Sequence, residues 1–217
     1  MELIIISPKE ENKYVKKLLE KIDSEFLPEQ VPVKIEEYSE KLNCFKNVDR
    51  KVELDGGKPH YGWVIYQTSI LCEAERHAVW ENDEEELIDI TPRDIDFEQV
   101  MFVSDNNFEY HGQIIDNYRV NITNNKIVDH FIKVCETLSD FYSLGKRKND
   151  SELEIDPQIA NTIYQYEDLK VQLELYIAKG STFRSKCICG GRKNYKNCCG
   201  GTLLERINND AKRIMKK

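Results

Sequence analysis

The sequence predicts an α+β fold, with an antiparallel sheet flanked by helices and followed by a long helix and a small cysteine-rich C-terminal module. Three observations support this prediction. Stretches rich in aromatic and β-branched residues alternate with polar turns in the middle of the chain, which is typical of strands. Apolar residues recur at intervals of three and four near both ends, as in amphipathic helices. Four of the seven cysteines lie within thirteen positions close to the C-terminus.

The first 145 residues are expected to form the α+β domain. Apolar residues at four-residue intervals predict a helix over residues 9–26 that stops before Pro28. A second helix is expected over residues 35–52, before the turn at Gly56 and Gly57. The expected strands cover residues 1–7, 61–71, 73–81, 86–91, 99–104 and 114–122, and a further helix covers residues 124–144.

A polar segment, Gly145-Lys-Arg-Lys-Asn-Asp150, has no apolar anchor and is the most linker-like part of the chain. We therefore place the main domain boundary there. Residues 146–183 are expected to be a linker and a long helix that begins near Pro157, since proline suits a first helical turn. Residues 184–200 form the cysteine-rich module, and residues 201–217 a basic C-terminal helix.

Length and composition favour an intracellular protein. The 217 residues suffice for one sizeable domain and an appendage. The opening residues lack a basic leader, and no apolar run approaches the roughly 20 residues of a membrane span. An odd number of cysteines would be awkward in an oxidising compartment. We expect a soluble, cytoplasmic protein that does not contact a membrane.

Charge is distributed unevenly along the chain, whose formal net charge is −8. Residues 180–217 hold ten basic side chains against Glu205 and Asp210, whereas the preceding residues hold 37 acidic and 21 basic ones. A basic tail on an acidic body indicates a partner such as the ribosome, RNA or an acidic protein surface. The alternative is a solvated charged helix at the chain end. The sequence assigns no oligomeric state.

The cysteine pattern is Cys-x-Cys, eight residues, and then two adjacent cysteines. A soft tetrahedral ion such as zinc takes four thiolate or imidazole ligands, and two local pairs joined by a short glycine-containing turn supply them with little loop-closure entropy. Arg192, Lys193 and Lys196 would offset the formal charge of about −2 that four thiolates leave on a divalent ion. A disulfide cluster or incidental thiols are the alternatives. The expected Zn²⁺ ligands are Cys187, Cys189, Cys198 and Cys199.

The run Cys187-Ile-Cys-Gly-Gly-Arg-Lys-Asn-Tyr-Lys-Asn-Cys-Cys-Gly200 resembles the SEC-C motif, the zinc-binding tail of the SecA preprotein translocase, which recurs at the end of many unrelated proteins. The family's Lys-x-Tyr-Lys core appears here as Lys193-Asn194-Tyr195-Lys196. Gly191 stands where the family usually has Ser, and Arg192 where it usually has Gly. The resemblance covers about fourteen residues and implies zinc coordination by all four cysteines.

A second chemical signal lies in two of the expected middle strands. If they form a hairpin about Asp83, then His77 lies directly opposite Asp89, on the same face of the sheet. A carboxylate placed this way accepts a hydrogen bond from the imidazole, which is how an aspartate orients a catalytic histidine. Cys44 is the candidate for the third member, because a thiol early in a helix becomes a better nucleophile.

The order of these residues, Cys44, then His77-Ala-Val-Trp on one strand, then Asp89-Ile-Thr-Pro on the next, resembles the transglutaminase-like branch of the papain-type thiol enzymes. In that fold a cysteine at a helix start meets a histidine and an aspartate from adjacent strands. The family's Gly-x-Cys context is replaced here by Asn43-Cys44. The resemblance implies that Cys44, His77 and Asp89 are catalytic.

Two functional hypotheses follow from these patterns. In the first, the N-terminal domain is a cysteine-dependent hydrolase or acyltransferase that acts on an amide, isopeptide or ester. In the second, it is a non-catalytic adaptor whose zinc tail docks on a ribosome, RNA or protein partner. Each candidate also has a structural reading, since most strand His–Asp pairs catalyse nothing and a single cysteine is more often a small buried hydrophobe.

Overall fold

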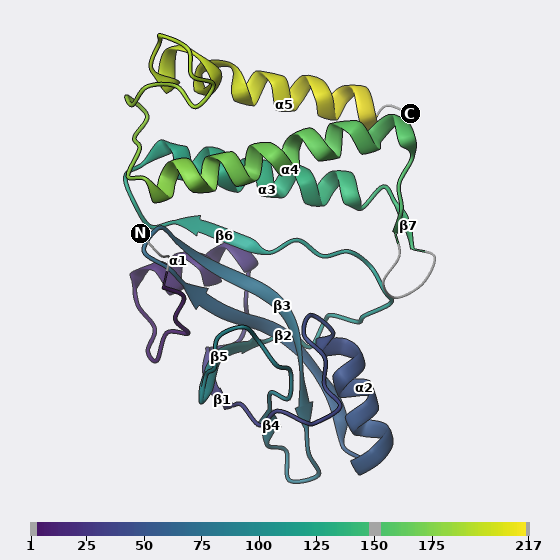
Figure 1. Cartoon of the computed structure of the whole chain (residues 1–217). Coiled ribbons are helices and arrows are strands. Elements are labelled where there is room, and N and C mark those ends of the chain that lie inside the picture. Colours follow the sequence, from purple (N-terminus) through teal and green to yellow (C-terminus); the bar gives the residue numbers. More distant parts are fainter. Residues whose placement is uncertain (1–3, 148–152, 216–217) are drawn as a thin grey trace. The chain divides into compact units, whose positions relative to one another are not determined.

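The computed structural model describes residues 4–147 and 153–215, and the chain divides into two compact units (Figure 1). The sheet unit comprises residues 4–111 and 117–120. The helical unit comprises residues 112–116 and the described residues from 121 onward. The predicted α+β class is confirmed. The units divide elsewhere than at residues 145–150, because the helix α3 (Lys126–Tyr142) packs with the helices that follow it.

The sheet unit is built on an antiparallel sheet with the strand order β1-β5-β2-β3-β4, and a further strand pairs with β3. Its longest pairing is the hairpin of β2 and β3, which runs from Lys58 opposite Glu81 to Gln67 opposite Cys72. The strands are β1 (Glu29–Pro32), β2 (Lys58–Gln67), β3 (Leu71–Glu81), β4 (Leu87–Ile88), β5 (Gln99–Ser104) and β6 (Tyr118–Asn121).

The two outer strands of this order, β1 and β4, are joined just beyond their ends. Val33 forms a parallel bridge with Asp89, flanked by hydrogen bonds from Asp89 N to Pro32 O (2.9 Å) and from Lys34 N to Asp89 O (2.8 Å). The sheet therefore curls until its two edges meet. The face inside the curl carries an apolar cluster, as expected for side chains that alternate between the two faces of a strand. The buried members of this cluster are Val31, Val64, Val79, Val100 and Phe102.

The helix α2 (Cys44–Asp55) packs against β2 and β3, with Val48 in a cluster that includes Ala78 and Ile88. Helix was expected from residue 35, but α2 begins only at Cys44. The reason is the Asn47 side chain, which accepts from Glu40 N (3.0 Å) and donates to Glu40 O (2.8 Å). These bonds hold the preceding segment in a turn, because an Asn side chain competes with helical backbone bonds.

Several other elements are shorter than the sequence predicts. The helix α1 (Lys13–Ile22) begins after Asn12, whose side chain accepts from the backbone N–H groups of Tyr14 and Val15, and ends at Asp23 with φ 53°. The strands β4 and β6 occupy only part of the ranges expected for them. Of the N-terminal strand expected over residues 1–7, residues 1–3 lie outside the described residues, and Ile6 bridges Gln67.

Strand β1 was not predicted, because Pro28 precedes it, Pro32 ends it, and proline normally weakens a strand assignment. Pro32 occupies the last position of β1 and still accepts a hydrogen bond through its carbonyl oxygen. Proline lacks a backbone N–H but keeps its carbonyl oxygen, so it can still accept a hydrogen bond from a neighbouring strand.

The helical unit consists of α3, α4 (Pro157–Ala178) and α5 (Cys199–Met215), which lie side by side (Figure 1), together with the short strands β7 (Lys146–Arg147) and β8 (Leu153–Glu154). The predicted long helix is present, and Asp156 caps it by accepting from Gln158 N. Tyr166 of α4 packs edge-on against Phe141 of α3 and donates to Asp210 of α5. Within the described part of the chain, every helix is too short or too polar to cross a membrane.

Candidate functional site

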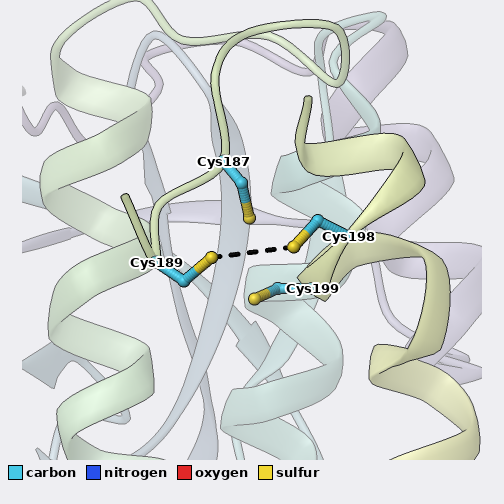
Figure 2. A group of neighbouring side chains, drawn as sticks. All are labelled: Cys187, Cys189, Cys198 and Cys199. Carbon is cyan, nitrogen blue, oxygen red and sulfur yellow. Dashed lines mark hydrogen bonds between the residues drawn. The ribbon is translucent and has the colours of Figure 1, made fainter. Parts of the chain in front are cut away.

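The four C-terminal cysteines converge, and their sulfur atoms all lie within 4.8 Å of one another (Figure 2). The Cys189 and Cys198 sulfurs are 3.6 Å apart, and all four thiols are free. Four sulfurs at about 2.3 Å from one tetrahedral zinc ion lie roughly 3.8 Å from one another. The spacing in the structure is therefore that of a tetrathiolate metal site, and this cluster could bind a metal ion.

Local backbone geometry brings the two cysteine pairs together. Cys187 N donates to Lys193 O and Gly190 N donates to Cys187 O, each at 3.0 Å, so the chain reverses between the pairs. Gly190 has φ 77°, a conformation that side chains with a Cβ rarely adopt. Cys198 follows the 3-10 turn η1 (Tyr195–Asn197), and Cys199 is the first residue of α5. The second pair therefore stands at a helix N-terminus, whose partial positive charge favours thiolates.

The four thiols differ in their electrostatic surroundings. Burial opposes ionisation of Cys187, but backbone N–H groups of Cys189 and Cys199 bond to its sulfur and lower its pKa to about 7. Burial, followed by the hydrogen bonds that its S–H donates to Cys187 and Cys189, raises the pKa of Cys199 to about 12. Hydrogen bonds with Cys189 and Cys187 also raise the pKa of Cys198. Ionisation of one thiol thus opposes ionisation of the others, and a cation at the centre would favour the thiolate form of all four cysteines.

Tyr195 anchors this cluster to the helices of the helical unit. Its ring is 1% exposed and packs against His130 of α3, Tyr176 of α4 and Phe183, with ring centroids 5.7 to 5.8 Å apart. The Tyr195 hydroxyl and His130 Nδ1 are hydrogen-bonded at 3.0 Å. A Cβ on Gly200 would lie 2.3 Å from the Tyr195 ring, so only glycine permits this approach. The cysteine cluster is therefore packed onto the helices and is not a free tail.

The other candidate residues, Cys44, His77 and Asp89, also come together. Asp89 Oδ1 lies 3.1 Å from His77 Nε2, within hydrogen-bond range. Cys44 is the first residue of α2 and is one of the groups whose charge and hydrogen bonding act on His77. The structure thus contains the hydrogen-bonded pair that the sequence predicts and places the thiol next to it. Their catalytic role stays a prediction.

The hairpin register that led to this expectation is wrong by two residues. Trp80 lies opposite Ile88, so the turn is centred one residue later than Asp83. His77 and Asp89 are consequently diagonal neighbours. A slip of one residue would have sent the two side chains to opposite faces, whereas a slip of two keeps them on the same face. Diagonal partners remain within reach of long side chains, which is why the hydrogen bond survives the shift.

Arg93 completes the group and was not anticipated. Its Nη2 bonds to Asp89 Oδ2 at 2.5 Å and lies 3.1 Å from His77 Nε2, and Thr91 N donates to Asp89 Oδ1. The sequence feature that could have pointed to Arg93 is its position four residues after Asp89, close enough along the chain to pair with that carboxylate. Burial works against the Asp89 charge, but His77 and Arg93 lower its pKa to about 2. Burial likewise works against charge on His77, but Asp89 and then Cys44 raise its pKa to about 10.

This second group is closed to solvent. The exposed fractions are 8% for Cys44, 3% for His77 and 0% for Asp89. Cys44 also belongs to the apolar cluster between α2 and the sheet, where it contacts residues such as Val48. Cys44 and Asp89 both act on His77, but substrate access would require the surrounding segments to move.

Comparison with known proteins gives no further assignment: no family model, no curated protein and no solved structure matches this chain.

Proposed function

We propose that Cys187, Cys189, Cys198 and Cys199 hold one Zn²⁺, and that the ion stabilises a basic C-terminal module that docks on RNA. The observation that carries the proposal is the mutual distance of the four sulfur atoms, all within 4.8 Å. This assignment agrees with the SEC-C resemblance. Bound zinc would act structurally, because four protein ligands leave no coordination position for a substrate.

Zinc is favoured over other ions by the ligand set. Thiolates are soft ligands, and hard ions such as Mg²⁺ and Ca²⁺ prefer oxygen. A tetrahedral site with four sulfurs fits zinc or iron, and zinc remains bound without redox chemistry in a reducing compartment. Iron is therefore the competing ion, and metal analysis distinguishes the two directly.

Docking on RNA is supported by the side chains around the cluster. Five basic residues flank the ligands in sequence, and all five are exposed. Zinc with four thiolates contributes a formal charge of about −2, so the module keeps an excess of positive charge. Positive side chains bind RNA by neutralising phosphates and releasing counterions. The five residues are Arg184, Lys186, Arg192, Lys193 and Lys196.

Metal analysis of the purified full-length protein tests the zinc site. We expect one zinc per chain, and we expect the variant Cys198→Ser/Cys199→Ser to lose it because two thiolates bind zinc too weakly to survive purification. Cys72→Ala serves as the control, since Cys72 is a buried thiol of β3 that lies outside the cluster. A protein without metal, or a double variant that keeps zinc, would refute the assignment, and iron in its place would correct the ion.

Salt dependence tests the docking proposal. We expect Lys193→Gln/Lys196→Gln to weaken binding to RNA and to reduce the steepness with which added salt weakens it, by about one phosphate contact per lysine. Lys17→Gln on α1 is the matched control, because Lys17 is an exposed lysine of the sheet unit. Association that does not depend on salt would indicate a specific protein partner in place of RNA.

Cysteine-dependent acyl transfer is the second candidate function, favoured by the convergence of Cys44, His77 and Asp89. His77 would draw the proton from Cys44 while Asp89 holds the imidazole, and the thiolate would attack an amide, isopeptide or ester carbonyl. The first backbone N–H groups of α2 have no partner within the helix and would help to bind the oxyanion.

Thiol labelling distinguishes this candidate from a structural role. A nucleophilic Cys44 would react with iodoacetamide at neutral pH much faster than Cys72, whose pKa burial raises to about 12. Equal, slow labelling of Cys44 and Cys72 would reject the catalytic role and leave the zinc module as the functional part of the chain.

A further inference from the structure

Three polar residues outside the sites above, His60, Glu81 and Ser104, meet on neighbouring strands. His60 lies on β2, Glu81 at the end of β3 and Ser104 at the end of β5. Glu81 is paired with Lys58 and Ser104 with Gly62, the positions two residues before and after His60 on β2. Because side chains alternate along a strand, all three point to the same face of the sheet.

The three side chains form a continuous hydrogen-bonded relay. His60 Nδ1 lies 2.8 Å from Glu81 Oε2, and His60 Nε2 lies 2.9 Å from Ser104 Oγ. A carboxylate only accepts hydrogen bonds, so the contact with Glu81 places the imidazole proton on Nδ1. With its proton on Nδ1 alone, the ring has a lone pair on Nε2 that can accept from the Ser104 hydroxyl. This is the donor order of a serine nucleophile, its general base and the acid that orients the base.

Glu81 is held in its ionised form by a second partner. Lys58 Nζ lies 2.8 Å from Glu81 Oε1, so one carboxylate oxygen binds the lysine and the other binds the imidazole. Burial would raise the pKa of Glu81, but the bonds with Lys58 and His60 outweigh it and lower the pKa. The carboxylate is therefore charged and fixed in position, as an orienting acid must be.

This relay differs from the group at His77 in two respects. The nitrogen of His77 that faces Asp89 is also approached by Arg93, whereas each nitrogen of His60 has its own partner. The His60 side chain is 18% exposed and that of His77 is 4% exposed. Of the two histidines, His60 is thus the one whose second ring nitrogen contacts a hydroxyl and whose side chain is more exposed to solvent.

We propose that Ser104, His60 and Glu81 form a serine acyl-transfer site that hydrolyses small carboxylic esters. Ser104 Oγ forms a bond to the ester carbonyl carbon while its proton passes to His60 Nε2. The tetrahedral intermediate collapses, the carbon–alkoxide bond breaks, and the alcohol leaves with that proton. Water then attacks the acyl-serine, again through His60, and releases the carboxylic acid and free Ser104. Small esters are specified because Ser104 is only 9% exposed.

A small covalent probe tests this proposal on the full-length protein. Diisopropyl fluorophosphate transfers its phosphoryl group to an activated serine and releases fluoride, and peptide mass mapping locates the adduct. We expect Ser104 to react at least about 100-fold faster than Ser69, an exposed serine in the turn between β2 and β3 of the same unit, because general-base catalysis contributes about 10² to 10⁴ in rate. This comparison within one wild-type molecule does not depend on whether any variant folds.

Variants then assign the roles. His60→Gln and Glu81→Gln should slow modification of Ser104 by at least about tenfold. Ser104→Ala should lower the rate at which the protein hydrolyses p-nitrophenyl acetate. Ser69→Ala is the matched control and should leave both readouts unchanged. Modification of Ser104 no faster than that of Ser69 would overturn the proposal, as would an unchanged Ser104 rate in folded His60→Gln.

Discussion

The cysteine cluster and the Cys44–His77–Asp89 group are both sets of chemically active side chains, but they are assembled in different ways. All four cysteines of the cluster come from thirteen consecutive positions, so a turn and the start of one helix suffice to position them. Cys44, His77 and Asp89 come from a helix, a strand and the segment after another strand. The first set is fixed by local geometry with a low loop-closure cost, and the second requires the whole sheet to be formed.

The two regions also balance charge differently. The cluster holds four thiols that oppose one another's ionisation, and a bound cation would favour all four thiolates. The His77 group is balanced by its own residues, since His77 and Arg93 both pair with the carboxylate of Asp89. We infer that the stability of the helical unit depends on a bound metal ion and that the stability of the sheet unit depends on pH. The following predictions test this difference.

Removal of the metal should produce the largest effect. Structural zinc contributes roughly 10 to 16 kcal/mol of apparent binding free energy in small zinc-binding peptides, and that energy is lost on chelation. We expect a strong chelator to abolish the protection of backbone amides in residues 183–215 from hydrogen exchange. Amides of β2 and β3 should keep their protection, because they belong to the sheet unit. Equal loss of protection in both units would contradict the division.

Truncation of Tyr195 should have the next largest effect. Tyr195→Ala removes a ring that is 1% exposed and in contact with three other rings, and we expect a loss of about 4 kcal/mol in the free energy of unfolding of the helical unit. Tyr195→Phe removes only the hydrogen bond with His130 and should cost about 1 kcal/mol. Urea unfolding of the zinc-loaded protein measures both. Equal costs for the two variants would show that the ring packing contributes little.

The buried pair in the sheet unit should give a defined dependence of stability on pH. The pKa of Asp89 is lowered from 3.8 to about 2, so its contribution is present above about pH 4 and is lost as pH falls towards 2. The pKa of His77 is raised from 6.5 to about 10, so its contribution is complete below pH 6.5 and is lost as pH rises towards 10. We therefore expect maximal stability of the sheet unit between about pH 4 and pH 6.5.

Asp89→Asn tests the source of this dependence. It leaves Arg93 and His77 without their shared carboxylate, and breaking a buried pair costs about 3 kcal/mol. The loss of stability between pH 6.5 and pH 10 should become much shallower, because Asp89 is the largest influence that raises the pKa of His77. Asp94→Asn is the control, since Asp94 is an exposed aspartate that pairs with Lys41. An unchanged slope in Asp89→Asn would assign the pH dependence to other groups.

These two regions also show what the sequence could predict. The cysteine spacing and the glycine-containing turn specify the cluster without knowledge of the fold, and the sequence identified all four members. Strand alternation placed His77 and Asp89 on one face, and this survived a register error because the error was an even number of residues. The relay from His60 to Ser104 depends on pairings between distant strands, so no local pattern indicated it.

Replacement of Cys44 should have the smallest effect on stability and separates packing from charge in the His77 group. Cys44→Ala and Cys72→Ala each remove one buried sulfur, so each should cost about 1 kcal/mol. Of these two thiols, only Cys44 raises the pKa of His77, and its influence is second to that of Asp89. In Cys44→Ala the pKa of His77, followed by NMR of the imidazole ring, should therefore fall below about 10, while in Cys72→Ala it should stay unchanged. If the pKa of His77 is the same in both variants, the Cys44 thiol contributes packing alone, and the thiol–imidazole contact that a catalytic role requires is absent.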